Sequence, residues 1–118
     1  MKQLSYVALI FTCTVAVACA QTYPQRPVRI VVASTPGSSP DVVARLLAQK
    51  LTERLGQQVV VENRAGVGGN LGAEAVARAP ADGHTLLLVM SSHAIGMSLY
   101  RNLNYDLVRD LAPVAPIA

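Results

Sequence analysis

The clearest pattern in the chain is the alternation of short apolar runs with longer amphipathic segments. Nearly continuous aliphatic and β-branched residues occupy positions 28–33, 58–62 and 84–90. Such runs are typical of strands that are buried on both faces, as in a parallel sheet. The sequence therefore predicts three short strands, each followed by a loop and a more polar segment.

A helix is predicted over residues 40–55, between the first two strands. Its apolar residues recur every three or four positions, which indicates one buried face; they are Val42, Val43, Leu46, Leu47, Leu51 and Leu55. Ser39 is the expected N-cap, because Pro40 then occupies the first helical position, where its missing N–H costs nothing. Gly56 is expected to end the helix in the left-handed conformation.

A second helix is predicted over residues 70–79, where small residues allow close packing on the sheet. The later segments are less regular: residues 91–100 are expected to form a short helix or turn, residues 105–110 a helical turn, and residues 112–117 the start of a fourth strand. The order strand, helix, strand, helix, strand indicates an α/β fold with a parallel βαβαβ sheet. All loops that follow strands then open at one edge of the sheet, where ligands bind in such folds.

Glycine and serine are concentrated in the two loops that connect a strand to a helix. The first loop, residues 34–39, reads Ser-Thr-Pro-Gly-Ser-Ser, and the second, residues 63–69, reads Asn-Arg-Ala-Gly-Val-Gly-Gly. A helix N-terminus offers unpaired N–H groups and a partial positive charge, and glycine lets a ligand approach the backbone. Two such helix ends at one edge of a sheet predict a binding site for a small anion.

Residues 1–20 have the pattern of a cleaved secretory signal peptide. A basic residue precedes an apolar run that ends in Ala18-Cys19-Ala20, which fits the small-residue cleavage rule. The run is shorter than the roughly 20 residues that a membrane-spanning helix needs. We therefore expect a mature chain that begins at Gln21, with a lipoprotein anchored through Cys19 as the alternative.

Composition excludes several classes of function. Both cysteines of the chain lie within the first 20 residues, so a mature chain cut after Ala20 has no thiol for a disulfide or a metal site. Ten Lys and Arg are interleaved with seven Asp and Glu, without the basic face or aromatic platform that nucleic-acid binding uses. Residues 21–118 are expected to form one lobe with an aliphatic core, and the apolar ending at Ala118 favours a truncated domain.

Several motifs resemble one family of receptors and follow the order found there. They are Tyr23-Pro-Gln-Arg-Pro-Val-Arg-Ile-Val-Val, Pro36-Gly-Ser-Ser-Pro-Asp-Val-Val-Ala-Arg-Leu-Leu-Ala, Val59-Val-Val-Glu-Asn-Arg-Ala-Gly-Val-Gly-Gly-Asn-Leu-Gly-Ala, Pro80-Ala-Asp-Gly-His-Thr-Leu-Leu and Tyr105-Asp-Leu-Val-Arg-Asp-Leu-Ala-Pro-Val. Through them, residues 22–118 resemble the first part of the Bug family, the extracytoplasmic receptors of tripartite tricarboxylate transporters.

The resemblance implies the N-terminal lobe of a type II periplasmic-binding-protein fold, truncated so that most of the second lobe is absent. It implies a periplasmic receptor that captures a small carboxylate for a membrane permease, not an enzyme, with no cofactor and no metal. The ligand-binding residues that it implies lie in the first two loops, at the start of the first helix and after the third strand; they are Ser34, Thr35, Gly37, Ser38, Ser39, Asp41, Gly66, Gly68, Gly69, Asn70, Ser91 and Ser92.

Individual residues keep alternative roles at this stage. Asp41 either contacts the ligand or stabilises the N-terminus of its helix, where it is also expected to pair with Arg45 on the outer face. Arg64 either attracts an anion or pairs with Glu62, and the pairing is favoured. The glycines of the second loop serve either the ligand or only the geometry of a turn.

Other functions are disfavoured by the residues present. A dinucleotide loop would need its third glycine at position 71, which is Leu71. A triad of Ser92, His93 and Asp106 lacks the G-x-S-x-G elbow around the serine. The remaining alternatives to a transport receptor are a sensory binding protein and a fragment that binds nothing.

Overall fold

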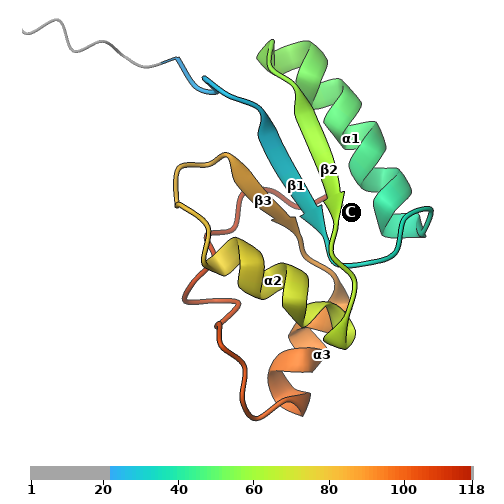
Figure 1. Cartoon of the computed structure of the whole chain (residues 1–118), viewed down its shortest axis with the longest axis vertical. Coiled ribbons are helices and arrows are strands. Elements are labelled where there is room, and N and C mark those ends of the chain that lie inside the picture. The colour runs from blue at the N-terminus through green and yellow to red at the C-terminus, as the bar shows by residue number, and fades with distance from the viewer. Residues whose placement is uncertain (1–21, 118) are drawn as a thin grey trace, which may run out of the picture.

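Residues 22–117 are described by a computed structural model of the chain, and they form a parallel α/β layer structure (Figure 1). The predicted signal peptide, with both cysteines, lies outside the described residues. The elements follow in the order β1 (Val28–Val32), α1 (Ser39–Leu55), β2 (Val59–Asn63), η1 (Val67–Gly69), α2 (Asn70–Ala77), β3 (Thr85–Leu88) and α3 (Ser91–Leu99). The predicted α/β class with three parallel strands is confirmed.

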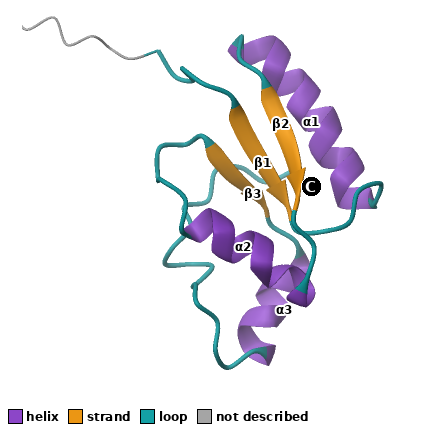
Figure 2. Cartoon of the chain, viewed as in Figure 1, coloured by secondary structure: helices purple, strands orange, loops and turns teal. Residues whose placement is uncertain are grey.

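The sheet has the strand order β2-β1-β3, with both neighbours parallel to β1. Val28 is in register with Val59, and Ile30 lies between Val61 on one side and Leu86 on the other. β1 is therefore the central strand, which explains why Val28, Ile30, Val31 and Val32 are all almost completely buried. Figure 2 shows the three strands pointing the same way, so that their carboxyl ends lie at one edge.

α1 covers one face of the sheet. Ala44 and Ala48 are buried against alternate residues of β1, and Leu47, Leu51 and Leu55 pack around them. Small residues at the centre of the helix face allow the helix to approach the strands closely. Val42, Val43 and Leu46 are exposed, so the predicted apolar face was too wide on this side.

The ends of α1 differ slightly from the expectation. The N-cap is Ser38 rather than Ser39, and Ser39 is the first helical residue, followed by Pro40. Gly56 ends the helix in the left-handed conformation, with φ 66°, and its N–H donates to the carbonyl of Thr52. The predicted left-handed cap is confirmed.

α2 packs on the opposite face of the sheet. A Cβ at Gly72 would lie 3.0 Å from Cβ of Ala33 and 3.2 Å from the carbonyl oxygen of Arg64. Such short distances leave no room for a larger residue, so the predicted close packing of a small-residue helix is confirmed. α2 ends at Ala77, two residues before the predicted end.

Two predictions at the C-terminal side are corrected. β3 ends at Leu88 rather than at residue 90, because the N–H of Met90 donates to Nδ1 of His93 at the start of α3. Residues 111–117 form no strand. Pro113 and Pro116 lack the N–H groups that a sheet ladder needs, which accounts for the missing fourth strand. The helical turn predicted near residue 106 is present, since the N–H of Asp110 donates to the carbonyl of Asp106.

Candidate functional site

The site is built at the edge where the carboxyl ends of the parallel strands meet. In the structure the first loop comprises residues 33–38, between β1 and α1, rather than the predicted 34–39, and the second loop comprises residues 64–69, between β2 and α2, rather than the predicted 63–69 (Figure 2). Two residues separate the end of β3 at Leu88 from the start of α3 at Ser91, at the same edge. The chain thus places three strand-to-helix connections side by side, as the strand order predicts.

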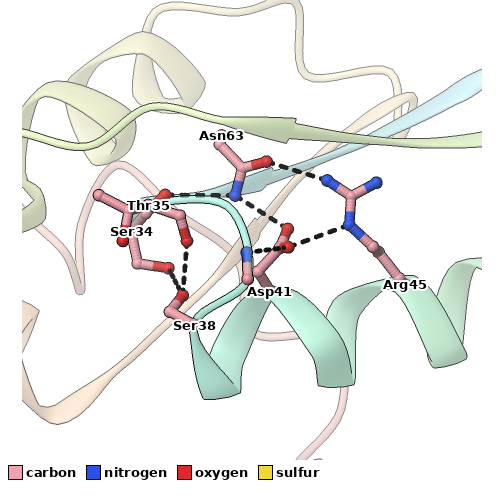
Figure 3. Close-up of polar contacts among 7 residues, drawn as sticks. Ser34, Thr35, Ser38, Asp41, Arg45 and Asn63 are labelled. Atoms are coloured by element: carbon pink, nitrogen blue, oxygen red, sulfur yellow. Dashed lines mark hydrogen bonds and ion pairs between the residues drawn. The ribbon is translucent and has the colours of Figure 1, made fainter.

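Serine hydroxyls and a glycine shape the first loop. Oγ of Ser34 and Oγ of Ser38 lie 2.8 Å apart, and the Ser38 hydroxyl donates to the carbonyl of Thr35 at 2.7 Å. Gly37 has φ 82°, in the left-handed region that favours glycine. These contacts hold the loop in a tight turn directly before the N-terminus of α1 (Figure 3).

Asp41 is buried under this loop, with 2% of its surface exposed. Its Oδ2 accepts hydrogen bonds from Nε of Arg45 at 3.0 Å and from the N–H of Gly37 at 2.8 Å, and its Oδ1 accepts from Nδ2 of Asn63 at 2.9 Å. The bonds from Arg45, Gly37 and Asn63 lower the pKa of Asp41 to about 2. The predicted pair with Arg45 is confirmed, but Asp41 is buried rather than on the outer face of α1.

The second loop has a backbone that requires glycine. Gly66, Gly68 and Gly69 have φ of 131°, 66° and 96°, and Val67 between them has φ 49°. The N–H of Gly69 donates to the carbonyl of Gly66, and that of Asn70 to the carbonyl of Val67. Turn geometry is thus one established use of these glycines, and their role toward a ligand stays a prediction.

The second loop packs directly against α3 and the end of β1. A Cβ at Gly69 would lie 3.0 Å from Nε2 of His93 and 3.3 Å from Cβ of Ala33. His93 is completely buried, its Nδ1 accepts from the N–H of Met90 at 3.0 Å, and burial lowers its pKa. Nδ1 also lies 3.3 Å from the carbonyl oxygen of Met90, and Nε2, on the side of Gly69, is buried without a hydrogen-bond partner.

Asn70 begins α2 and is 5% exposed. Its Oδ1 accepts a 2.8 Å hydrogen bond from the hydroxyl of Tyr105, and its Nδ2 is buried without a hydrogen-bond partner. Tyr105 is itself buried, and this burial, together with the nearby Glu74, raises its pKa. The segment after α3 is therefore tied to the start of α2.

The other predicted residues lie around these buried groups. Thr35, Ser39, Gly66, Gly68 and Ser91 are exposed, whereas Ser34, Ser38 and Ser92 are half-buried. Ser91 and Ser92 form the first turn of α3. Arg64 pairs with Glu62 and lowers the pKa of that carboxyl, as favoured from the sequence.

The Ser92, His93 and Asp106 triad does not form, and residues 22–117 contain no metal-ligand cluster. Nδ1 of His93 is engaged by Met90, and Oδ1 of Asp106 accepts from the N–H groups of Val108 and Arg109, so the triad considered from the sequence does not form. Within the same range, no three His, Cys, Asp or Glu side chains are grouped so that they could hold a metal ion.

Two surface hollows lie away from the loops. One of about 430 Å³ lies between α1 and β2, where Arg45 and Thr52 line it, and one of about 370 Å³ lies at the amino end of the sheet, where Arg26 and His84 line it. No helix in the described part of the chain is long and apolar enough to cross a membrane. The loops at the carboxyl edge remain the place where helix N-termini, glycines and hydroxyls come together.

Asn63, His93 and Tyr105 were not among the predicted ligand-binding residues, yet each contacts a residue of the candidate site. Asn63 could have been predicted from its position, because a polar side chain at the carboxyl end of a parallel strand lies where such sheets bind ligands. His93 is buried next to Gly69, and Tyr105 is buried against Asn70. No local sequence pattern predicts these contacts.

A parallel α/β lobe with glycine-rich loops at the carboxyl edge is typical of a ligand-binding lobe. The model of the tripartite tricarboxylate transporter family receptor matches residues 43–118. Protein BugT of Bordetella pertussis is 47% identical over 122 residues, which cover 99% of this chain and 37% of BugT. The chain belongs to this family of transport receptors, which is not an enzyme family.

Solved structures agree with this assignment. The periplasmic binding protein BugD matches with a TM-score of 0.68 and 45% identity over 71% of this chain and 28% of that protein. MatC from Rhodopseudomonas palustris with bound malate matches with a TM-score of 0.70 and 38% identity over 75% of this chain and 30% of that protein. A further R. palustris protein, with adipate, matches with a TM-score of 0.61 and 37% identity.

The match covers only part of each relative. This chain spans about a third of the length of the curated relatives, 37% of BugT and 35% of a protein from Bordetella bronchiseptica. The similarity therefore shows the family of this chain and not the activity of a complete receptor.

Proposed function

We propose that the chain supplies the carboxylate-binding lobe of an extracytoplasmic solute receptor for a tripartite tricarboxylate transporter. The observation that carries the proposal is the likeness to two R. palustris proteins, one with bound malate and one with adipate, at 38% and 37% identity. Both ligands are dicarboxylates. The predicted anion site, formed by the loops before α1 and α2, suits one carboxylate group of such a ligand.

The proposed contacts combine backbone and side-chain groups. The first turns of α1 and α2 direct N–H groups and partial positive charge toward the loops. The hydroxyls of Ser34, Ser38, Ser91 and Ser92 lie at the same edge and are proposed to donate further hydrogen bonds, directly or through water. Gly37, Gly69 and Asn70 already use their N–H groups within the chain, so we propose that they line the site and shape it.

The cellular setting is also a proposal. We propose that residues 1–20 export the protein to the periplasm, that residues 21–118 form the binding lobe, and that a membrane permease receives the ligand. The periplasmic relatives support this setting, because BugD is described as a periplasmic binding protein.

One observation favours a second candidate, a piece that binds nothing on its own. The loops lie at an open edge, and the chain spans about a third of its relatives. Ligand sites normally bury most of the ligand surface, which a single lobe does not do. Binding by this chain alone is therefore expected to be weak.

A thermal-shift series tests the proposal. Ligands that bind the folded state raise its apparent stability by mass action. Malate and adipate at increasing concentration are expected to raise the melting temperature of the mature chain, whereas sodium chloride of equal ionic strength and the neutral diamide of malate are not. Equal shifts for the salt and for malate would favour the non-binding candidate.

A further inference from the structure

One buried carboxylate contacts both sides of the candidate site. Asp41 accepts from the N–H of Gly37 in the first loop at 2.8 Å and from Nδ2 of Asn63, the last residue of β2, at 2.9 Å. Figure 3 shows Asp41 between the first loop and the end of β2, with Arg45 on its far side. Asp41 and Asn63 are 22 residues apart, so the contact depends on the pairing of β1 with β2.

Asn63 extends the connection in both directions. Its Nδ2 also lies 3.2 Å from the carbonyl oxygen of Ser34, and its Oδ1 accepts from Nη2 of Arg45 at 3.2 Å. The next residue, Arg64, opens the second loop, and its N–H donates to the carbonyl of Val32 at 2.9 Å. Hydrogen bonds thus join the first loop and Asp41 to Asn63, and the peptide bond from Asn63 to Arg64 continues into the second loop.

Asp41 has neither the exposure nor the free atoms to serve as a ligand contact. Its side chain is 3% exposed, and both of its oxygens accept hydrogen bonds from the chain. A carboxylate ligand in contact with it would also meet a like charge. Arg45 compensates the charge of Asp41 from the side of α1.

We propose that Asp41 is a positioning residue that acts through Asn63 to fix the first loop against the start of the second. The proposal rests on the proposed function only for the use of these loops in carboxylate binding. It resolves the alternative roles of Asp41 in favour of a structural link between two loops.

The proposal can be tested by an NMR pH titration of the isotope-labelled chain. The amide proton of Gly37 and the side-chain amide protons of Asn63 are both expected to shift as pH falls, with one common midpoint near 2, because one carboxylate accepts from both. Glu53→Gln, which removes an exposed carboxylate of the same helix, is the matched control and is expected to leave this midpoint unchanged. Two different midpoints, or a shift of only one reporter, would overturn the proposal.

A second arm at pH 6 does not depend on stability in acid. Asn63→Ala is expected to speed hydrogen exchange of the Gly37 amide about tenfold or more, because the carboxylate then loses the donor that fixes it. Gln49→Ala, which removes an exposed side-chain amide from α1, is expected to have no effect. An unchanged Gly37 exchange rate in folded Asn63→Ala would contradict the link.

A conservative variant covers the case in which Asn63→Ala does not fold. Asn63→Asp keeps the shape but replaces the donating nitrogen by a charged oxygen, so the midpoint of the Gly37 titration is expected to rise. An unchanged midpoint would overturn the proposal. None of these measurements uses a ligand, so their failure and a failure of carboxylate binding are separate results.

Discussion

The hydroxyl of Tyr105 donates a 2.8 Å hydrogen bond to Oδ1 of Asn70, across 35 residues of sequence. Both residues are buried, at 4% and 5% exposure. The contact joins the segment after α3 to the first residue of α2, next to the glycines of the second loop. The start of α2, next to the second loop, is therefore held by a side chain from the C-terminal part of the chain.

Removal of this hydroxyl is the first test. Tyr105→Phe leaves Oδ1 of Asn70 buried without its donor, and we expect it to reduce the free energy of unfolding by about 1–3 kcal/mol. Tyr100→Phe is the matched control, because Tyr100 is 38% exposed, and its effect should stay within about 0.5 kcal/mol. Urea unfolding of both variants measures the difference, and equal effects would show that the buried bond contributes nothing specific.

The two adjacent glycines of the second loop should respond differently to a methyl group. Both have positive φ, which costs an L-residue about 1–2 kcal/mol. At Gly68 a Cβ has room, with Tyr100 Oη at 3.5 Å, whereas at Gly69 it would lie 3.0 Å from Nε2 of His93. We expect Gly69→Ala to be less stable than Gly68→Ala by a further roughly 1–3 kcal/mol, from overpacking.

Substitutions at Gly68 and Gly69 should also affect carboxylate binding more than a substitution elsewhere on the surface. In a full-length relative that carries these loops, Gly68→Val and Gly69→Val are expected to weaken binding more than Arg54→Ala, which lies at the far end of α1. Calorimetry measures the affinity, and circular dichroism checks that the variants fold. Unchanged affinity in folded loop variants would mean that the glycines serve the turn alone.

His93 should make stability depend on pH. Burial lowers its pKa in the folded state, so the unfolded chain binds the proton more tightly. The stability is fully present above the ordinary histidine pKa of about 6.5 and is lost as pH falls below it. Protonation of Nδ1 would also remove the acceptor for the Met90 N–H.

Unfolding measured at pH 7.5 and at pH 5 checks this dependence. In His93→Gln, the free energy of unfolding is expected to fall less between pH 7.5 and pH 5 than in the unchanged protein. His84→Gln, the matched change at the other histidine, is expected to keep the full decrease. The same decline in His93→Gln as in the unchanged protein would contradict the assignment.

The three strands and the helices α1 and α2 could be predicted because their signals are local. β-branched runs mark β1 and β2, and Gly56 marks the end of α1. Errors arose where tertiary contacts decided the outcome. Val42 and Leu46 continue the apolar stripe of α1, yet the sheet contacts Ala44 and Ala48 instead.

The positions of the loops were predictable, but their support was not. Parallel strands bring the first and second loops to one edge whatever their sequence. The contact of Asp41 with Asn63 depends on the register of β1 and β2, and that of Gly69 with His93 depends on where α3 packs. Spacing along the chain carries neither piece of information.

The most direct test of the carboxylate site is an NMR titration of the isotope-labelled mature chain with malate. We expect weak binding, with a dissociation constant of about a millimolar or weaker, because one lobe leaves much of the ligand in water. The amide shifts should be confined to residues 34–41, 64–72 and 91–93, and the neutral diamide of malate should produce none. Shifts centred elsewhere, such as on the hollow between α1 and β2, would contradict the assignment of the site. Micromolar binding would contradict the view that a second lobe is needed.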